Sequence, residues 1–203
     1  KSGIAWSLHL QGWPALMQGE FEAARALAEE SLMIFRELEE KRGIAWSLML
    51  LGGVLVWFQK NYVAARVLFE ESLAVFRELG DKRGIGYALQ NLGEVDHFQG
   101  RDADARERFE ESLTTFQEIG EKAGLAFGLQ DLGHSARAQG DYETARGLYE
   151  QSLAIWRELG NRVGIAHALG CLGEVAQARG DYETAQAFHA QSVALRQELG
   201  RKG

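Results

Sequence analysis

The chain has 203 residues, of which 46% are hydrophobic and 25% charged, so it can bury a substantial core and is not a disordered tail. Its net charge is −7 without a basic stretch, and no run approaches the roughly 18 apolar residues of a membrane span, so we expect neither nucleic acid nor a membrane as a partner. Cys171 is the single cysteine and cannot form an internal disulfide, which favours a reducing, cytoplasmic location.

One phrase recurs through the whole sequence. Residues 83–93 read Arg-Gly-Ile-Gly-Tyr-Ala-Leu-Gln-Asn-Leu-Gly, and variants of this phrase occupy 123–133 and 163–173. Self-similarity at a fixed period predicts a repeat architecture. The glycines that lead the copies, Gly3, Gly43, Gly84, Gly124 and Gly164, lie 40, 41, 40 and 40 residues apart. We therefore predict a single all-α solenoid over residues 1–203, with five repeats at approximately 3–42, 43–83, 84–123, 124–163 and 164–203.

Each copy contains two helical stretches. The first covers about 15 residues, as from Ile85 to Gln99, and ends at a glycine that can adopt the left-handed conformation, such as Gly100. An acidic residue such as Asp141 then opens the second helix, at the positive end of its dipole. Pro14 is expected to kink the first helix of copy one or to end it early. Further helix-ending glycines are predicted at Gly80, Gly120, Gly140, Gly160, Gly180 and Gly200.

Three positions hold a small residue in all five copies. Glycine recurs in the middle of the first helix, where it costs about 1 kcal/mol relative to alanine, so we expect another helix backbone to approach closely there. Alanine and serine recur seven residues apart on one face of the second helix. These positions are Gly12, Gly52, Gly93, Gly133 and Gly173, then Ala24, Ala65, Ala105, Ala145 and Ala185, then Ser31, Ser72, Ser112, Ser152 and Ser192.

The Leu-Gly of the first helix and the Gly-Asp-Tyr-x-x-Ala that opens the second resemble the tetratricopeptide repeat family. The usual repeat has about 34 residues, so the longer unit is most similar to variants in kinesin light chain, in cell-polarity adaptors and in the C-terminal arms of large bacterial regulators. The resemblance implies a right-handed solenoid of about ten antiparallel helices. Neither end of the chain shows a polar capping repeat, so we expect a piece of a longer array that is able to associate end to end.

The spacings that enzymes and metal sites require are missing from the sequence. There is no phosphate-binding glycine loop, no His-Glu-x-x-His and no cysteine pair, so we predict no enzymatic activity, no cofactor and no metal. His134 and His167 could approach each other near Cys171, but zinc usually takes about four ligands. We therefore interpret the two histidines as ordinary groove residues, and a redox role for Cys171 is likewise not favoured.

In the tetratricopeptide family, ligand peptides commonly lie on a concave surface that the first helices line. Four positions per copy form one helical stripe facing this groove: six and three residues before the mid-helix glycine, and one and four after it. The candidates for partner binding are 15 residues at these positions and three neighbouring residues. They are Trp6, His9, Trp13, Trp46, Met49, Trp57, Tyr87, Gln90, Asn91, Glu94, His97, Phe127, Gln130, Asp131, His134, Arg137, His167 and Glu174.

The predicted groove changes character along the chain. Its first position holds a ring in every copy (Trp6, Trp46, Tyr87, Phe127 and His167), and such regularity favours a packing ladder over a specificity element. The other positions are apolar in copies one and two and polar beyond them. The apolar end is either an interaction site with tryptophan anchors, or a surface that packs against repeats absent from this chain. The sequence leaves both interpretations open.

Three functional hypotheses follow. The first is a protein-interaction scaffold that binds a peptide or a partner's helix in the groove, anchored near Trp6, Trp46 and Trp57. The second is an effector-sensing or autoinhibitory arm of a larger bacterial signalling or transcription regulator. This hypothesis rests only on the similarity of the repeated sequence to such arms. The third is a passive spacer, which predicts no ligand and tolerance of groove mutations.

Overall fold

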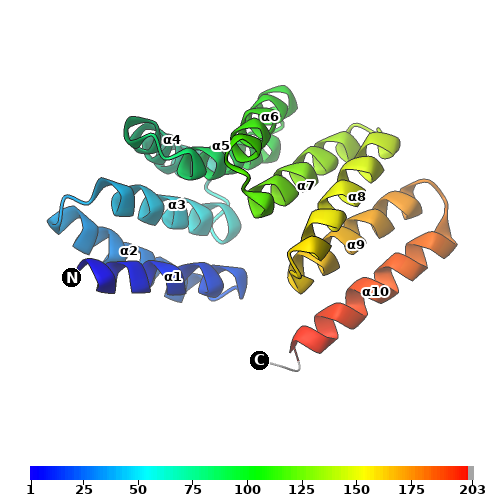
Figure 1. The fold of residues 1–203 in the computed structure, drawn as a ribbon, viewed down its shortest axis with the longest axis horizontal. Helices are drawn as coiled ribbons and strands as arrows, with labels where there is room; N and C mark the ends of the chain where they lie inside the picture. Colours follow the sequence, from blue (N-terminus) through cyan, green and yellow to red (C-terminus); the bar gives the residue numbers. More distant parts are fainter. Residues whose placement is uncertain (201–203) are drawn as a thin grey trace. The chain divides into compact units, whose positions relative to one another are not determined.

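The computed structural model describes residues 1–200, and over these residues it consists of α-helices without a strand (Figure 1). The predicted all-helical repeat fold is confirmed. The end of the predicted fifth repeat, 201–203, lies outside the described residues. The helices are α1 (Ser2–Met17), α2 (Phe21–Glu37), α3 (Lys41–Trp57), α4 (Tyr62–Leu79), α5 (Lys82–Phe98), α6 (Asp102–Ile119), α7 (Lys122–Ala138), α8 (Tyr142–Glu158), α9 (Arg162–Ala178) and α10 (Tyr182–Gly200).

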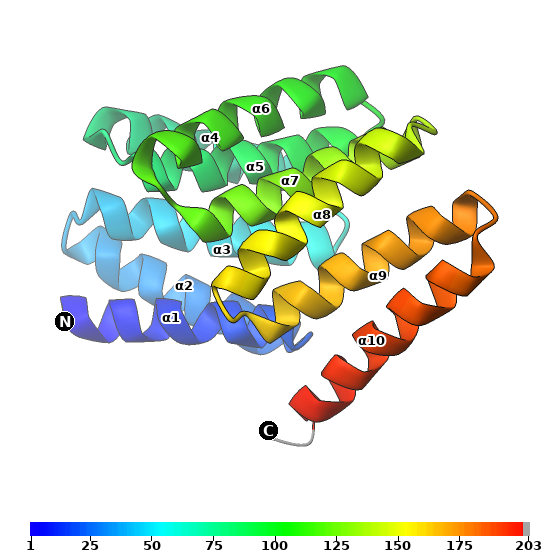
Figure 2. The same cartoon turned by 45° about the vertical axis from the view of Figure 1, so that its right-hand side comes forward.

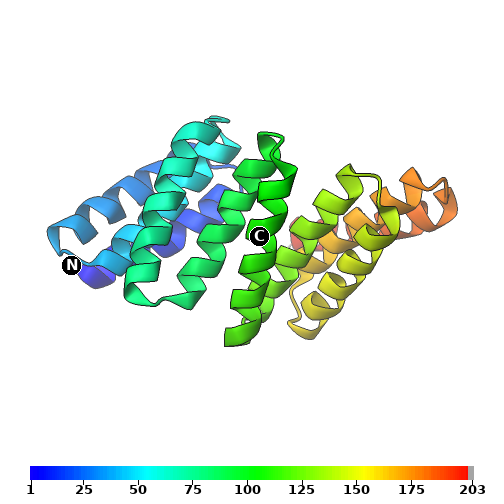
Figure 3. The same cartoon turned by 90° about the horizontal axis from the view of Figure 1, so that it is seen from above.

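The helices fall into two compact units. The N-terminal unit, Lys1–Thr115, holds α1 to α5 and most of α6, and the C-terminal unit, Phe116–Gly203, holds the end of α6 and α7 to α10. Within each unit, successive helices pack as antiparallel neighbours (Figures 2 and 3). In the N-terminal unit, the first helices of successive pairs also touch, α1 against α3 and α3 against α5. The prediction of one continuous solenoid with five repeats stays a prediction.

The first helices begin earlier than expected because a side chain caps each of several N-termini. Asp81 precedes α5, and its carboxylate accepts a hydrogen bond from the Gly84 amide at 3.1 Å. Asn161 does the same for Gly164 at 2.9 Å before α9. A capping oxygen satisfies one of the free amides of the first turn. The leading glycines therefore lie inside the first turn, and α5 covers Lys82–Phe98 instead of the predicted Ile85 to Gln99.

Helix ends follow the glycine pattern, with two exceptions. Gly80 and Gly100 have φ of 64° and 73° and end α4 and α5 in the left-handed conformation, and Gly120, Gly140, Gly160 and Gly180 also have positive φ. Gly200 does not, since it is the last residue of α10. Of the two outcomes expected at Pro14, an early end of the helix is wrong, because α1 continues to Met17 and the Pro14 carbonyl still accepts from the Gln18 amide at 3.0 Å. The expected kink stays a prediction.

Aromatic rings explain the mid-helix glycines. A Cβ on Gly52 would lie 2.3 Å from the Phe69 ring, and one on Gly133 would lie 2.5 Å from the Tyr149 ring. In both cases the ring comes from the second helix of the same pair. The expected close approach of a helix backbone is therefore wrong, since the nearest atoms belong to a buried side chain.

The leading glycines receive a ring from the preceding second helix in the same way. A Cβ on Gly84 would lie 2.3 Å from the Phe76 ring, and one on Gly164 would lie 2.4 Å from Trp156. Phe76 and Trp156 are fully buried. Each ring thus packs directly on the backbone of the next helix, which requires a residue without a side chain at that point.

The recurring serines link the two helices of the same repeat. The hydroxyl of Ser72 donates to the carbonyl of Ala45 at 2.9 Å, and that of Ser152 donates to Ala126 at 2.8 Å. Both serines are fully buried, so an unpaired hydroxyl there would be costly. Ser112 and Ser192 make the equivalent bonds to Gly86 and Ala166. The alanines seven residues earlier are buried as well, so the repeated small residues form the interior of the fold.

Within residues 1–200, no helix combines the length and the apolar composition needed to cross a bilayer.

Candidate interaction surfaces

The candidate binding residues of the N-terminal unit separate into two groups. His9, Met49 and Gln90 are buried, with His9 only 4% exposed, so they pack inside the unit. The others keep part of their surface accessible, and Trp57 is 44% exposed. We call the accessible group the N-terminal face; it comprises Trp6, Trp13, Trp46, Trp57, Tyr87, Asn91, Glu94 and His97, on α1, α3 and α5.

The first-position rings of this unit pack on the rings of the second helices. Trp6 meets Phe35 edge-on with ring centroids 4.9 Å apart, and Trp46 meets Phe76 at 5.0 Å. Trp46 also meets Tyr87 of the next first helix at 6.0 Å. Edge-to-face contacts of this kind stabilise beyond the burial of area. The packing-ladder interpretation therefore describes these rings, although each retains an accessible edge.

His9 lies among three tryptophans. Its ring centroid is 5.7 Å from Trp6, 6.4 Å from Trp13 and 6.2 Å from Trp46. The indole Nε1 of Trp13 donates to His9 Nε2 at 3.3 Å, so this nitrogen is the acceptor. Burial lowers the pKa of His9 to about 4, which keeps the imidazole neutral at pH 7. His9 is thus a buried part of the aromatic cluster, whereas the sequence analysis predicted that it faces the groove.

A second aromatic cluster forms around Trp57, at the C-terminal end of α3. The Trp57 ring meets Phe98 edge-on at 5.8 Å, and Phe98 stacks on Tyr62 at 5.4 Å. The Lys60 ammonium lies 5.9 Å from the centroid of the Trp57 ring. Phe98 is exposed like Trp57, and sequence reasoning missed it. The available signal was its place as the last residue of α5, in line with the end of α3.

The N-terminal unit also contains a buried carboxylate that sequence reasoning missed. Asp96 is only 1% exposed and accepts hydrogen bonds from three guanidinium groups: Arg66, Arg101 at 2.7 Å and Arg108 at 2.7 Å. Burial alone would raise the pKa of the carboxyl, but the hydrogen bonds from Arg101 and Arg66 and the charges of Arg66 and Arg108 outweigh it and hold that pKa below its ordinary value. The sequence signal that could have identified Asp96 was an acidic residue on the apolar side of this helix, adjacent to Val95, which is buried.

Some polar residues of the N-terminal face are already engaged within the unit. The Asn91 amide donates to the carbonyl of Tyr87 at 2.8 Å. His97 Nδ1 lies 3.0 Å from an Asp102 carboxylate oxygen at the start of α6. A partner that pairs with either side chain must therefore exchange an existing contact.

The predicted residues of the C-terminal unit are more polar. Phe127 is half-exposed and packs on Trp156 with ring centroids 4.7 Å apart, while Gln130 is buried. Arg137 of α7 and Glu174 of α9 form an ion pair at 3.3 Å across the two first helices. Asp131, His134 and His167 keep part of their surface accessible.

Gln130, His134 and His167 come together with the Cys171 thiol between α7 and α9. The rings of His134 and His167 are 5.9 Å apart, and Cys171 Sγ lies 4.0 Å from a nitrogen of each. The Tyr149 hydroxyl lies 2.9 Å from His134 Nδ1, and Gln130 Oε1 lies 3.2 Å from His167 Nδ1. Burial raises the pKa of the Cys171 thiol to about 12, so the free thiol stays protonated at pH 7.

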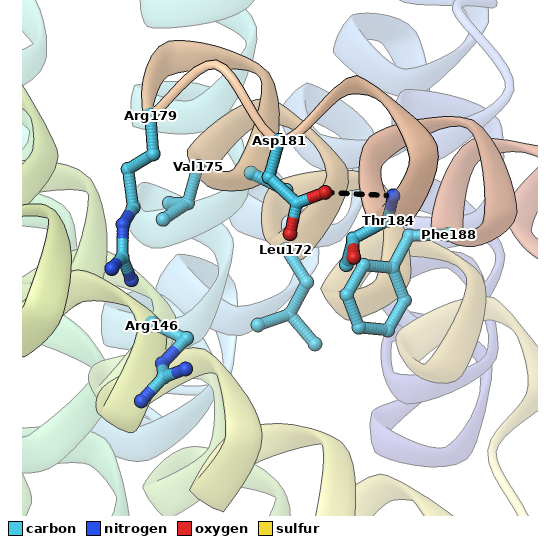
Figure 4. Close-up of a pocket in the computed structure, with 8 residues that line it drawn as sticks. Arg146, Leu172, Val175, Arg179, Asp181, Thr184 and Phe188 are labelled. Atoms are coloured by element: carbon cyan, nitrogen blue, oxygen red, sulfur yellow. Dashed lines mark hydrogen bonds between the residues drawn. The ribbon is translucent and has the colours of Figure 1, made fainter.

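Two cavities of about 220 Å³ lie elsewhere in the molecule. One is in the C-terminal unit, between α8, α9 and α10, where Arg146, Arg179 and Asp181 surround apolar side chains (Figure 4). The Asp181 carboxylate there accepts from the Thr184 amide at 3.1 Å, and Arg179 pairs with Glu143 at 2.6 Å. The other is in the N-terminal unit, lined by Arg25, Glu29, Leu51, Val54, Leu55, Gln59 and Leu68. Neither cavity is lined by a residue of the predicted groove.

Comparison with known families identifies the repeat. A tetratricopeptide repeat model matches residues 43–118 and 125–198, and a second tetratricopeptide repeat model matches residues 5–30. No curated protein matches the chain in sequence.

Solved structures share the fold at low sequence identity. BtubC from P. vanneervenii is 20% identical with a TM-score of 0.74, over 98% of this chain and 82% of that one. A kinesin light chain with nearly identical TPR-like repeats, from Podosopora anserina, is 18% identical with a TM-score of 0.63, over 99% of each chain. A Rap protein complexed with competence and sporulation factor is 16% identical with a TM-score of 0.84, over 95% of this chain and 54% of that one.

Proposed function

Because this chain belongs to the tetratricopeptide repeat family, we propose that it is a protein–protein interaction scaffold that binds a peptide or a partner's helix on the face of its first helices. The observation that carries the proposal is the N-terminal face itself. Three neighbouring helices, α1, α3 and α5, each contribute a partly accessible ring to it, from Trp6, Trp46 and Tyr87. Accessible aromatic side chains on a rigid support are typical anchors of protein interfaces.

The N-terminal face combines anchoring and polar groups in the way an interface requires. Trp57 is the most exposed residue of the aromatic cluster that it forms with Phe98 and Tyr62, and Phe98 enlarges its apolar surface. Glu94 and His97 lie on α5 beside these rings and supply polar groups that can select a partner's register. Buried His9, Met49 and Gln90 would act by supporting the face from below. The proposal includes no catalytic step.

The C-terminal unit would offer a separate contact region of different chemistry. Phe127 is its accessible ring, while Arg137 and Glu174 present an ion pair that is more than a third exposed on both sides. Exposed pairs of this kind contribute little stability, so Arg137 and Glu174 are free to exchange partners at low cost. We therefore expect polar residues of a partner to contact this unit.

Selection from a displayed peptide library, with the 203-residue chain as bait, would test the proposal. We expect the selected peptides to lose about tenfold or more in affinity, measured by fluorescence anisotropy, when Trp57 is replaced by alanine, because an anchor contributes at least about 1.4 kcal/mol. Val67→Ala is the matched control, since Val67 is an exposed apolar residue on α4. Equal affinity of both variants for every selected peptide, or no selected peptide at all, would contradict the proposal.

A second candidate is an effector-sensing or autoinhibitory arm of a larger bacterial signalling or transcription regulator. It is favoured by the similarity to the Rap protein, whose structure contains competence and sporulation factor and of which this chain spans only 54%. This candidate predicts that the ligand changes the activity of an adjoining domain. Reading the parent gene and assaying any such domain with and without this chain separates it from a simple scaffold, which predicts no change.

A further inference from the structure

We propose that His134, His167 and Cys171 bind a borderline-soft divalent cation of the Zn²⁺ type between α7 and α9. Among the described residues, they are the group of three metal-ligating side chains whose ligand atoms all lie within 4.8 Å of one another. Imidazole nitrogen and thiolate sulfur are the ligands that Zn²⁺ prefers, and three protein ligands with one open position are an established arrangement for it. This inference does not depend on the proposed partner binding.

The spacing of the ligands follows from the helices. His167 and Cys171 are four residues apart on α9, which places them on the same face one turn apart. His134 reaches them from α7. Cys171 Sγ lies 4.0 Å from His134 Nε2 and 4.0 Å from His167 Nδ1. Tetrahedral bonds of the usual lengths to Zn²⁺ would bring these atoms to about 3.3 to 3.6 Å from one another. Small side-chain rotations therefore suffice, and His167 is exposed and free to make them.

Tyr149 holds His134 in the orientation that a metal requires. Its hydroxyl lies 2.9 Å from Nδ1 of His134, so the opposite nitrogen, Nε2, points to the thiol. The tautomer with the proton on Nδ1 donates to the Tyr149 oxygen and leaves the lone pair of Nε2 for the cation. An outer partner of this kind fixes the ring and its tautomer in most metal-binding histidines. Tyr149 is itself fixed, since its buried ring packs on Gly133.

Gln130 adds an oxygen at the same point. Its side chain is 2% exposed, its Oε1 lies 3.2 Å from His167 Nδ1, and its buried Nε2 has no hydrogen-bond partner. When His167 Nδ1 binds the cation, it gives up this hydrogen bond, and the neutral ring takes the tautomer that carries its proton on Nε2. The Cys171 thiol releases its proton to solvent. The Gln130 oxygen then faces the cation, where it or a water molecule completes four ligands. His167 is exposed, so the ion can enter from solvent.

Titration with Co²⁺ tests the site, because Co²⁺ replaces Zn²⁺ and reports a thiolate ligand by a charge-transfer band in the near ultraviolet. The probe is Co²⁺ alone, added to the full chain under a non-thiol reductant, followed by displacement with Zn²⁺. We expect one Co²⁺ per chain, a charge-transfer band, and full loss of that band when Zn²⁺ is added. Absence of binding at micromolar protein and metal would overturn the proposal.

Four variants make the test specific. Cys171→Ser should abolish the charge-transfer band, and His134→Gln should weaken Co²⁺ binding at least as much as Tyr149→Phe, which should weaken it about tenfold or more. His97→Ala, which removes a histidine of the N-terminal face, should bind as the unmodified chain does. Circular dichroism verifies that each variant is folded. Unchanged binding in folded Cys171→Ser or His134→Gln would show that the ion binds elsewhere and would overturn the assignment.

Thermal unfolding gives a second readout that needs no absorbance band. A ligand that binds only the folded state raises its midpoint with concentration. Zn²⁺ should therefore raise the midpoint of the unmodified chain and of His97→Ala, and leave that of Cys171→Ser unchanged. An equal rise in all three would contradict the site.

Discussion

The N-terminal and C-terminal units place different chemistry on one shared framework. In both, a buried serine of a second helix binds a carbonyl of a first helix, as Ser72 and Ser152 do, and a ring covers a glycine. The corresponding faces differ. In the N-terminal unit His9 is buried among three tryptophans, whereas in the C-terminal unit His134 meets a tyrosine, a second histidine and a thiol.

This difference shows which positions of the repeat are constrained. The serines that bind a carbonyl in the interior keep their type, because a change in polarity there cannot be absorbed by solvent. The side chain that packs on the mid-helix glycine stays a ring from Phe69 in copy two to His189 in copy five, because the space above the glycine is filled. Residues on the accessible side of the first helices are held by neither constraint. The same position can therefore hold Trp46 in one repeat and His167 in another, and the framework carries two surfaces of different chemistry.

The largest expected effects test whether the framework is equivalent in the two units. Phe76 and Trp156 occupy the same repeat position and are fully buried. Alanine at either should lower the free energy of unfolding by roughly 3–5 kcal/mol, because it removes a buried ring and leaves a cavity. Urea unfolding followed by circular dichroism measures both. Val163→Ala, at an exposed site, is the control and should change little. A large cost in only one unit would break the comparison.

Asp96 should distinguish the units by pH, since its three arginine partners belong to the N-terminal unit. Asp96→Asn should lower the free energy of unfolding by roughly 1.5–3 kcal/mol at pH 7, because hydrogen bonds to a charged group are lost. The pKa of Asp96 is lowered in the folded state, so its contribution is present above the ordinary pKa of about 4 and is lost as the pH falls through the folded value. The difference between variant and unmodified chain should therefore shrink below about pH 4.

Tryptophan fluorescence can follow the unfolding of the N-terminal unit at each pH. Four of the five tryptophans, Trp6, Trp13, Trp46 and Trp57, lie there, and Trp156 lies in the other unit. The matched measurement is amide hydrogen exchange. The Asp96 substitution should speed exchange in α8 and α9 no more than it does in α3 and α5. A pH-independent cost of Asp96→Asn would contradict the assigned role of its charge.

Two glycine substitutions should have opposite signs within one helix pair. Gly133→Ala should destabilise the chain by roughly 1–3 kcal/mol, since its Cβ would lie 2.5 Å from the Tyr149 ring. Gly147→Ala in α8 meets no atom within 4 Å and should stabilise it by about 0.5–1 kcal/mol through higher helix propensity. Gly93→Ala, which faces Phe109, gives the N-terminal counterpart of the first change. Chemical unfolding of the three variants decides whether contact with a ring sets the sign.

The smallest expected loss of stability concerns the interior serines. Ser72→Ala and Ser152→Ala should each lower the free energy of unfolding by about 1 kcal/mol, the net value of one hydrogen bond. Both hydroxyls bind a helix carbonyl at similar distance, 2.9 and 2.8 Å, so their costs should agree. A difference above about 1 kcal/mol between them would show that the units do not share an equivalent interior. Thr114→Ala, at an exposed hydroxyl on α6, is the control.

The repeat and the helices could be predicted because they depend on local and periodic signals. Capping residues such as Asp141, helix-ending glycines such as Gly100, and the recurrence of small residues all act within a few positions. The same rules failed at Gly200, and at Pro14 the expected early end of the helix is wrong. The local penalty of Pro14 did not end α1, because Ala15 and Leu16 beyond it are buried in one cluster with side chains of α2 and α3.

The accessible surface could be predicted only in part. Most residues of the predicted helical stripe are partly accessible, and their role in binding a partner stays a prediction. It could not separate buried His9 and Met49 from accessible Trp46, because depth within a stripe depends on rings that arrive from other helices. It also missed Phe98 and Asp96, which acquire their surroundings from residues on α3, α4 and α6.

The sequence by itself determined that the chain is a tetratricopeptide repeat array, since its motif of small residues recurs at a fixed period along the whole chain. Only the tertiary structure decided why the glycines are there and which polar groups meet. A ring lies on the mid-helix and leading glycines of the repeats after the first, as at Gly52 and Gly84, and side chains of residues 134, 167 and 171 converge across two helices. Contacts between residues some 37 positions apart depend on how the helices pack, and no local rule of sequence specifies that.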